Sequence, residues 1–308
     1  MIHTVTLNPS LDKTAKCDSF EKGNLNRIEI TSYDVGGKGI NASKTIRALN
    51  GVSTAYAILG GAVGATIKDV LETRYIPLFT STVEQNTRIN LKVIDKKGSL
   101  TEFNELGPHV DKKNITEIVN ALKANVKPLD VVILAGSVPN GINSNVYQKM
   151  IIEVKKLGAL VILDTSGEAL IEGIKSCPTI IKPNRRELAE CFGEESLTIT
   201  QCIEKAKELI KTGIVLVVVS LGKEGALFVT KDNVYLALPI HVETKSSVGA
   251  GDAMVGAIAY GYDQRYTLEE IMKLSMAAAT GAVTTVGTKP AEAKYVKQVM
   301  KAVVLKKK

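Results

Sequence analysis

Apolar residues gather in short runs along the chain, with polar segments between them. Four of these runs are rich in β-branched residues, are bounded by turn residues and predict buried strands at 131–134, 160–163, 179–181 and 215–219. Helical periodicity lies between the first three, notably at 144–157, and precedes the fourth at 203–212. Because strands buried on both faces form continuous hydrophobic runs, this alternation predicts a doubly wound α/β fold with a mostly parallel sheet.

Two segments, 11–33 and 87–103, are rich in β-forming residues without intervening helical patterns. We expect antiparallel strands from about 11–35 and 86–104 that stand outside the main sheet. The chain has no linker-like, repeated or low-complexity segment, so we expect one domain over residues 1–308.

The hexapeptide Ser247-Val248-Gly249-Ala250-Gly251-Asp252 precedes an apolar run typical of a buried helix. Its two glycines let the backbone approach a ligand closely, and free N–H groups with the positive dipole end attract phosphate at a helix start. Asp252 stands where it can accept a proton, so the motif favours phosphoryl transfer. The alternative is a tight loop that Asp252 merely caps. Since a helix N-terminus favours the ionised form, we expect a lowered pKa for Asp252.

A second glycine-rich turn, Gly36-Gly37-Lys38-Gly39-Ile40-Asn41, opens a helix that ends at Asn50-Gly51. Lys38 and Asn41 can donate hydrogen bonds to a polar ligand. The spacing matches neither a Walker A loop nor the dinucleotide-binding fingerprint of Rossmann folds.

The two glycine turns together resemble the paired signature of the PfkB carbohydrate kinase family, and the resemblance covers essentially the whole chain. Further landmarks of the family occur in order at 6–12, 87–90, 136–139, 164–167, 182–187 and 220–225. The resemblance implies the ribokinase-like fold, in which a small β-sheet lid covers the sugar site. It also implies phosphorylation of a sugar, with ATP and Mg²⁺ as cofactors. After Gly64 the chain has Ala65 where the family often has aspartate, which weakens any ligand contact there.

By this resemblance Asp252 is the catalytic base, and the backbone N–H groups of Gly249, Ala250 and Gly251 hold the transferred phosphoryl group. The implied nucleotide-binding positions are Lys182, Asn184, Ser220, Gly222, Gly225, Ser247 and Val248. Asn184 and Glu187 would organise Mg²⁺ through water. The alternatives are a simple turn at 220–225 and a surface helix that carries Glu187.

The positions that match the family's sugar-phosphate site are Asn8, Asp12, Gly37, Lys38, Asn41, Arg88, Asn90 and Ser137. Arg27 would reach an existing phosphate from the lid, including the lid of a neighbouring subunit. Three cations, Lys38, Arg88 and Arg27, favour an acceptor that is already phosphorylated. Ser247-Val248 before the second glycine turn and the intact Thr87-Arg88-Ile89-Asn90 favour fructose 1-phosphate over tagatose 6-phosphate. Fructose 6-phosphate, an unphosphorylated sugar or nucleoside, and a non-catalytic sugar-phosphate sensor stay open.

The formal net charge of +7 adds little to this interpretation, because the basic residues are dispersed and only 5% of residues are aromatic. We therefore expect sugar phosphate and ATP as partners, no nucleic acid, and a homodimer through the lid. The sequence lacks a membrane-length apolar run and a signal-peptide pattern, so we expect no membrane association and a cytoplasmic location. The irregular spacing of the four cysteines indicates free thiols.

Overall fold

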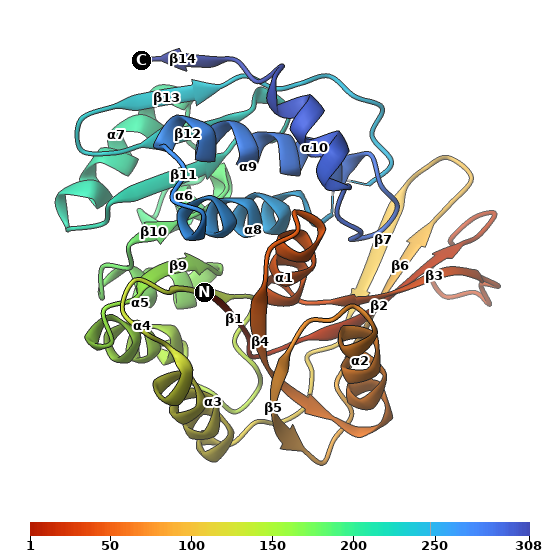
Figure 1. Ribbon diagram of the computed structural model, residues 1–308. Coiled ribbons are helices and arrows are strands. Elements are labelled where there is room, and N and C mark those ends of the chain that lie inside the picture. Colours follow the sequence, from red (N-terminus) through yellow and green to blue (C-terminus); the bar gives the residue numbers. More distant parts are fainter. Residues whose placement is uncertain (247) are drawn as a thin grey trace.

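The structure is a computed structural model that describes residues 1–246 and 248–308. Its larger sheet has ten strands in the order β14-β13-β12-β11-β10-β9-β8-β1-β4-β5 (Figure 1). The parallel strands are β1 (Ile2–Thr6), β4 (Ser53–Gly60), β5 (Leu78–Val83), β8 (Val131–Ala135), β9 (Leu160–Asp164), β10 (Ile180–Ile181) and β11 (Leu216–Ser220). An antiparallel edge follows, made of β12 (Ala226–Val229), β13 (Val234–Ala237) and β14 (Leu305–Lys307). The predicted strands and the mostly parallel sheet are confirmed.

The direction of chain growth reverses beside β1. From this strand the chain first adds β4 and β5 on one side, and later adds β8, β9, β10 and β11 on the other. In an open α/β sheet, ligands bind outside the carboxyl ends of the strands at such a reversal. The topology therefore places a binding crevice where β1 and β8 end.

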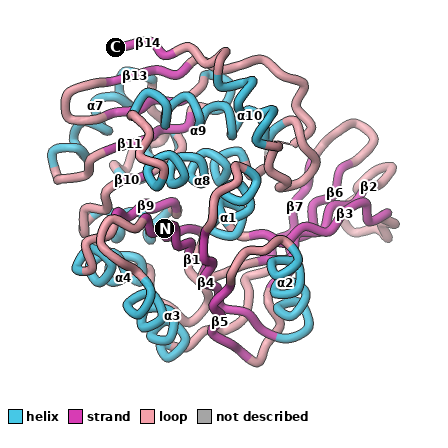
Figure 2. Tube along the Cα trace, in the orientation of Figure 1, coloured by secondary structure: helices cyan, strands magenta, loops and turns pink. Residues whose placement is uncertain are grey.

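Helices cover both faces of this sheet (Figure 2). One face carries α1 (Lys38–Ala48), α2 (Gly61–Thr73), α8 (Ala250–Asp263), α9 (Leu268–Val283) and α10 (Ala293–Met300). The other face carries α3 (Lys112–Asn125), α4 (Val146–Lys156), α5 (Gly167–Ile174), α6 (Arg185–Cys191) and α7 (Ile199–Lys211). Strand residues alternate between the two apolar layers: Tyr56 and Ile58 of β4 pack with α3 and α4, whereas Ala55 and Ala57 pack with α1 and α2. The described helices include none that is long and apolar enough to cross a membrane.

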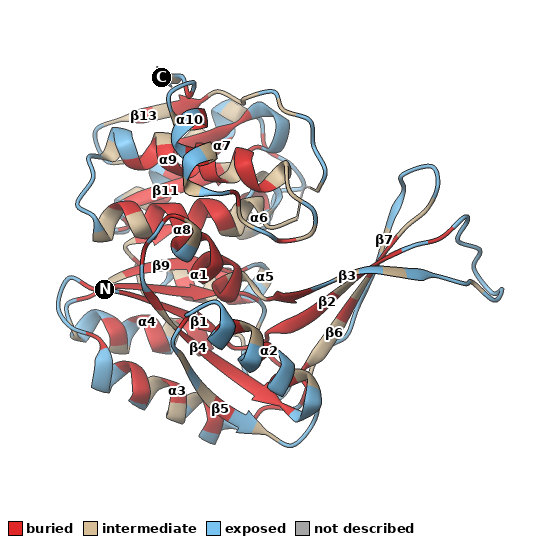
Figure 3. Ribbon diagram, turned by 45° about the vertical axis from the view of Figure 1, so that its right-hand side comes forward, coloured by how far each residue is buried: buried red, intermediate tan, exposed pale blue. Residues whose placement is uncertain are grey.

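A second sheet of four strands projects from this body as the lid (Figure 3). Its order is β3 (Glu29–Gly36), β2 (Ser10–Lys16), β6 (Arg88–Ile94) and β7 (Leu100–Asn104). The two outer pairs are antiparallel, but the central pair, β2 with β6, is parallel. Our expectation of antiparallel strands is therefore wrong for the centre of the lid. A hairpin pattern predicts local pairing only, and β2 and β6 are joined by a long connection through β3, α1, β4, α2 and β5.

Candidate active site

Polar side chains from two neighbouring strand ends meet at the carboxyl edge of the large sheet. Asn8 follows β1 and Ser137 follows β8, the two strands that flank the reversal. The side-chain amide of Asn8 donates to Oγ of Ser137 across 3.2 Å and to the carbonyl of Leu106 at 3.2 Å. Oδ1 of Asn8 is buried without a hydrogen-bond partner, which is the state of an acceptor that a ligand can satisfy.

Helix α8 begins at the turn that carries Gly249. This residue caps the helix with φ of 85°, a left-handed conformation that glycine adopts without strain. The N–H of Ala253 already donates to the Gly249 carbonyl at 2.8 Å, while the N–H groups of the first helical residues have no partner within the helix. Val248 donates its N–H to Oγ of Ser246 at 3.2 Å, and Ser247, expected to bind nucleotide, lies outside the described residues.

Asp252, in the first turn of α8, lies beside the other glycine turn. Its Oδ2 accepts a hydrogen bond of 2.8 Å from the side-chain amide of Asn41 on α1. Burial of the carboxyl group, reinforced by the charge of Asp164, raises its pKa, and the attraction of Lys38 acts in the opposite direction. Our expectation of a lowered pKa is therefore wrong. The helix start supplies only a partial charge, whereas burial and a second carboxylate disfavour the ionised form more strongly.

Asp164 ends β9 and pairs with both lysines of the predicted site. It is only 1% exposed, and its Oδ1 lies 2.9 Å from Nζ of Lys38 and 3.4 Å from Nζ of Lys182. Burial opposes ionisation, but the two lysines lower the pKa of Asp164, and this carboxylate with Glu187 raises the pKa of Lys38 despite its burial. Asp164 therefore holds Lys38 in its charged form and brings the two lysine side chains together.

The sequence places Asp164 at the carboxyl end of a strand, where binding residues are expected, but we assigned it no specific role from the sequence. Its pairing with Lys38 and Lys182 was not predicted, because the three residues come from separate segments of the chain.

Asp12 is the centre of a polar network on the lid. Its Oδ1 accepts from Oγ of Ser10 at 2.8 Å and from the amide of Asn90 at 2.9 Å, and its Oδ2 accepts from Nζ of Lys92 at 2.9 Å. Burial opposes the charge, but Lys92 holds the pKa of Asp12 below its usual value. Lys92 was missed in the sequence. Because Asn90 and Lys92 are two residues apart on one strand, they share a face, and this spacing was the available signal.

The two arginines expected near the sugar phosphate lie in different places. Arg88 begins β6 at the base of the lid, where its Nε donates to the Asn8 carbonyl at 3.3 Å and its Nη1 to the Glu105 carbonyl at 3.4 Å. Arg27 is exposed in the loop between β2 and β3, beyond the far end of that ribbon. Six strand residues separate Ser10 from this end, which is roughly 20 Å of extended chain. Arg27 is therefore not part of the site in its own chain.

A cavity of about 680 Å³ opens beside the α8 turn. Its lining includes Asn184, Ser220, Gly222 and Gly225 from the strand ends together with Ala250 and Gly251 from the turn. Its apolar wall is formed by Met254, Met276, Ala279 and Val283 of α8 and α9. A cavity with an apolar wall and a phosphate-binding helix start at one end suits a nucleotide.

The residues expected to organise Mg²⁺ cap helix α6. The Asn184 Oδ1 accepts from the N–H of Glu187 at 2.8 Å, and Glu187 Oε2 accepts from the N–H of Asn184 at 2.8 Å. This capping box leaves Oε1 of Glu187 outside the cap, and Oδ2 of Asp164 is buried without a hydrogen-bond partner. Within the described residues no cluster of three metal-ligating side chains occurs. Two carboxylate oxygens fit a hydrated Mg²⁺ shared with phosphates better than an ion enclosed by protein ligands.

Comparison with known proteins agrees with this geometry. The sequence profile of the pfkB family carbohydrate kinases matches residues 5–294. The chain belongs to the PfkB carbohydrate kinase family. It is 34% identical to the 1-phosphofructokinase of Bacillus subtilis (strain 168), with 97% of each chain covered. It is also 34% identical to the tagatose-6-phosphate kinase of Staphylococcus epidermidis, with 89% of each chain covered.

Solved structures show the same PfkB fold. Phosphofructokinase-2 from Escherichia coli in complex with fructose-6-phosphate superposes with a TM-score of 0.91 at 28% identity, covering 98% of both chains. The expected ribokinase-like fold and kinase class are confirmed. The four cysteines are free thiols, as expected.

Proposed function

We propose that this PfkB kinase transfers the γ-phosphoryl group of ATP to the 6-hydroxyl of fructose 1-phosphate and forms fructose 1,6-bisphosphate. The observation that carries the proposal is the junction of the two glycine turns, where Asn41 contacts Asp252. In the proposal, Asp252 is the proton acceptor at the edge of a phosphate-binding helix start, and the buried Lys182 and the half-buried Lys38 lie nearby on Asp164. The relatives named 1-phosphofructokinase support this choice of acceptor.

The bonds change in one step. The O6–H proton passes to an oxygen of Asp252, O6 forms a bond to the γ-phosphorus, and the bond from that phosphorus to the β,γ-bridging oxygen breaks to release ADP. The raised pKa makes Asp252 a stronger base than an ordinary surface aspartate, while Asn41 orients its Oδ2.

The charge of the moving phosphoryl group falls on the chain's own donors. Backbone N–H groups at 249–251 point toward it from the helix start, and Lys38 and Lys182 add positive charge from the Asp164 side. Mg²⁺, when bound with ATP, neutralises phosphate charge, and Glu187 with Asp164 would hold it through water, aided by Asn184 as part of the α6 cap.

On the acceptor side, Asn8, Asp12 and Asn90 present polar groups toward sugar hydroxyls, and Arg88 lies beside them to bind the existing phosphate. Gly37, Ser137 and Lys38 complete this side in the proposal. The nucleotide occupies the cavity lined by Ser220, Gly222 and Gly225. The nucleotide-binding roles of Ser247 and Val248 remain predictions. The cytoplasmic location of the protein also remains a prediction.

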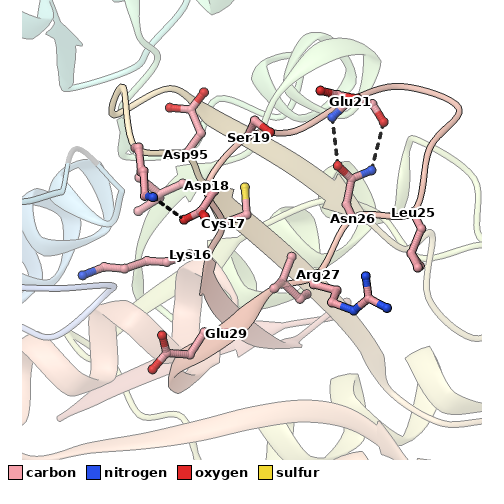
Figure 4. A pocket seen from close by; sticks show the side chains of 13 residues that line it. Lys16, Cys17, Asp18, Ser19, Glu21, Leu25, Asn26, Arg27, Glu29 and Asp95 are labelled. Carbon is pink, nitrogen blue, oxygen red and sulfur yellow. Dashed lines mark hydrogen bonds and ion pairs between the residues drawn. The ribbon is translucent and has the colours of Figure 1, made fainter.

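We also propose that the lid pairs with the lid of a second copy. Its outer part exposes large apolar side chains, namely Phe20, Leu25, Ile28, Tyr33, Leu100 and Phe103. A hollow of about 920 Å³ under the 17–28 loop has Arg27 on its wall (Figure 4). Within this loop, hydrogen bonds join the Asn26 side chain to the backbone of Glu21. An ion pair between Asp18 and Lys96 connects the loop to the neighbouring strand end. Because Arg27 does not reach its own site, pairing of lids is its route to the phosphate of the partner's sugar.

Coupled ADP release, measured with ATP and Mg²⁺, tests the acceptor. We expect the highest kcat/KM with fructose 1-phosphate when it is compared with tagatose 6-phosphate, fructose 6-phosphate and free ribose. A preference for tagatose 6-phosphate would move the chain to the activity named for the staphylococcal relative. Ligand-induced thermal stabilisation without ADP release would instead favour a sugar-phosphate sensor.

A further inference from the structure

Helix α1 carries a buried lysine that the proposed reaction does not use. Lys44 is 3% exposed and lies one turn after Asn41, on the same face of the helix. Its Nζ donates to the Val35 carbonyl of β3 at 2.8 Å and to Oγ1 of Thr288 at 2.9 Å. Both partners are neutral oxygens, so the ammonium group is buried without the direct carboxylate contact that Lys38 and Lys182 have.

The hydroxyl that Lys44 holds belongs to the segment that lies behind the phosphate-binding turn. A Cβ placed on Gly249 would lie 3.5 Å from both Cα and Cβ of Thr288, so Thr288 forms the surface against which this turn rests. The neighbouring Gly287 lies against Asp34, whose Oδ2 would be 2.2 Å from a Cβ at that glycine. The corner at 287–288 is thus enclosed between the Lys44 and Asp34 side and the Gly249 turn.

The other side of the same turn is attached to the end of α9. The Val283 carbonyl accepts from the N–H of Lys245 at 2.8 Å and from that of Ser246 at 3.3 Å. The turn before α8 therefore lies between two contacts, Val283 on one side and Thr288 on the other, and Lys44 holds the hydroxyl of the second.

We propose that Lys44 is a positioning residue for phosphoryl transfer, which acts through Thr288 to hold the Gly249 turn in the geometry that binds the γ-phosphate. The proposal rests on the proposed function in one respect, namely that this turn receives the γ-phosphate. It is independent of which sugar phosphate is the acceptor. A lysine that served only to fill the core would stabilise the fold without affecting γ-phosphate recognition.

The charge of Lys44 is sensitive to pH in the range where such an enzyme is assayed. Burial lowers the pKa of Lys44 to about 8, with Arg74 acting in the same direction, while Asp34, Asp12 and Asp252 act against it. As pH rises through this value, the ammonium group becomes a neutral amine and its hydrogen bond to Thr288 loses charge assistance.

The test compares the affinities of ADP and of a β,γ-imido analogue of ATP, each with Mg²⁺, by calorimetry. The variants are Lys44→Met, Lys44→Arg and Thr288→Val, and the control is Lys68→Met on the exposed face of α2. We expect Lys44→Met to reduce the preference for the ATP analogue about tenfold, the effect of one lost charge-assisted hydrogen bond, while ADP affinity stays within about twofold. Lys44→Arg should restore part of the preference.

Two further results distinguish a positioning role of Lys44 from a role in stabilising the fold alone. Thr288→Val should reduce the preference for the ATP analogue by a similar factor. The double variant, Lys44→Met with Thr288→Val, should lose no more of this preference than the poorer single variant, because both substitutions remove the same contact. The wild-type preference should fall as pH rises through about 8 but stay level in Lys44→Arg.

An equal loss of affinity for ADP and for the ATP analogue in Lys44→Met would overturn the proposal. An unchanged preference for the ATP analogue in folded Lys44→Met would overturn it as well. If Lys44→Met does not fold, an unchanged preference in Thr288→Val would overturn it equally. A lost preference in a protein that phosphorylates none of the sugars would leave this inference standing and reject the proposed acceptor.

Discussion

Asn41 donates its side-chain N–H to Oδ2 of Asp252 over 2.8 Å, although 211 positions separate the two residues in the chain. Each residue belongs to a different glycine turn, and each turn opens a different helix, α1 or α8. These helices pack against one another, so the relative position of the turns is set by a large contact between them. The proton acceptor of the proposed reaction is therefore oriented by the turn that also carries Lys38.

Replacement of Asp252 by asparagine tests its role as the base. Asp252→Asn keeps the shape of the side chain but removes its ability to accept the proton. We expect kcat to fall by ~10²–10⁴-fold with little change in KM. Steady-state kinetics with fructose 1-phosphate measure this. Glu269→Gln, which neutralises an exposed carboxylate on α9, should leave both constants unchanged. Unaltered turnover in Asp252→Asn would remove this residue from the mechanism.

Removal of the Asn41 amide should shift the pH profile in a defined direction. The N–H of Asn41 stabilises the ionised form of Asp252 and so lowers its pKa, against the larger effect of burial. In Asn41→Ala the pKa of Asp252 rises further, so the base is protonated at a higher pH. The acid limb of kcat should therefore move to higher pH. Asn120→Ala on the exposed side of α3 should not move it. A shift to lower pH would contradict the assignment.

Asp164→Asn should destabilise the fold as well as reduce activity. The substitution leaves Lys182, which is 5% exposed, without its charge partner. Breaking a buried pair in this way costs about 3–5 kcal/mol of the free energy of unfolding. Urea unfolding near pH 7 should show this loss, together with lower turnover.

The pH dependence of that loss follows from the lowered pKa of Asp164. The paired carboxylate contributes stability above the pKa of the unfolded aspartate, and this contribution is lost as pH falls through the lower folded pKa. The difference in the free energy of unfolding between the wild type and Asp164→Asn should therefore become smaller at acid pH. Equal stabilities at neutral pH would show that Lys38 and Lys182 do not depend on this carboxylate.

The sequence patterns correctly predict the features that depend on neighbouring residues, namely individual strands and helix starts. The strand predicted at 160–163 is recognised because burial on both faces requires continuous apolar residues, and both glycine turns do open helices. The parallel pairing of β2 with β6 and the ion pairs of Asp164 depend on chain segments that no local pattern connects.

The same distinction explains the pKa of Asp252. Sequence neighbours place it at a helix start, but Asp164 and the surrounding protein, which determine the direction of the shift, come from elsewhere in the chain. Local sequence therefore gives the type of chemistry at the site, while the strength of the base is a property of the assembled fold.

Arg27 provides a test that separates a site within one chain from a site shared by two. If Arg27 binds the phosphate of the partner's sugar, Arg27→Ala should raise the KM for fructose 1-phosphate about tenfold and leave the KM for ATP unchanged, because one charged contact is lost. Lys22→Ala, an exposed change in the same loop, serves as the control.

Mixing subunits then decides between the two arrangements. A dimer of one Arg27→Ala chain and one Asp252→Asn chain contains one complete site, with Asp252 from the first chain and Arg27 from the second. Random reassociation of equal amounts should therefore restore about a quarter of wild-type activity at low sugar concentration in a two-fold symmetric dimer. Activity equal to the average of the two parents would show that Arg27 does not act across the lid. Because the two chains carry defects in different elements, the lid loop and α8, recovery can only come from a site that both chains build.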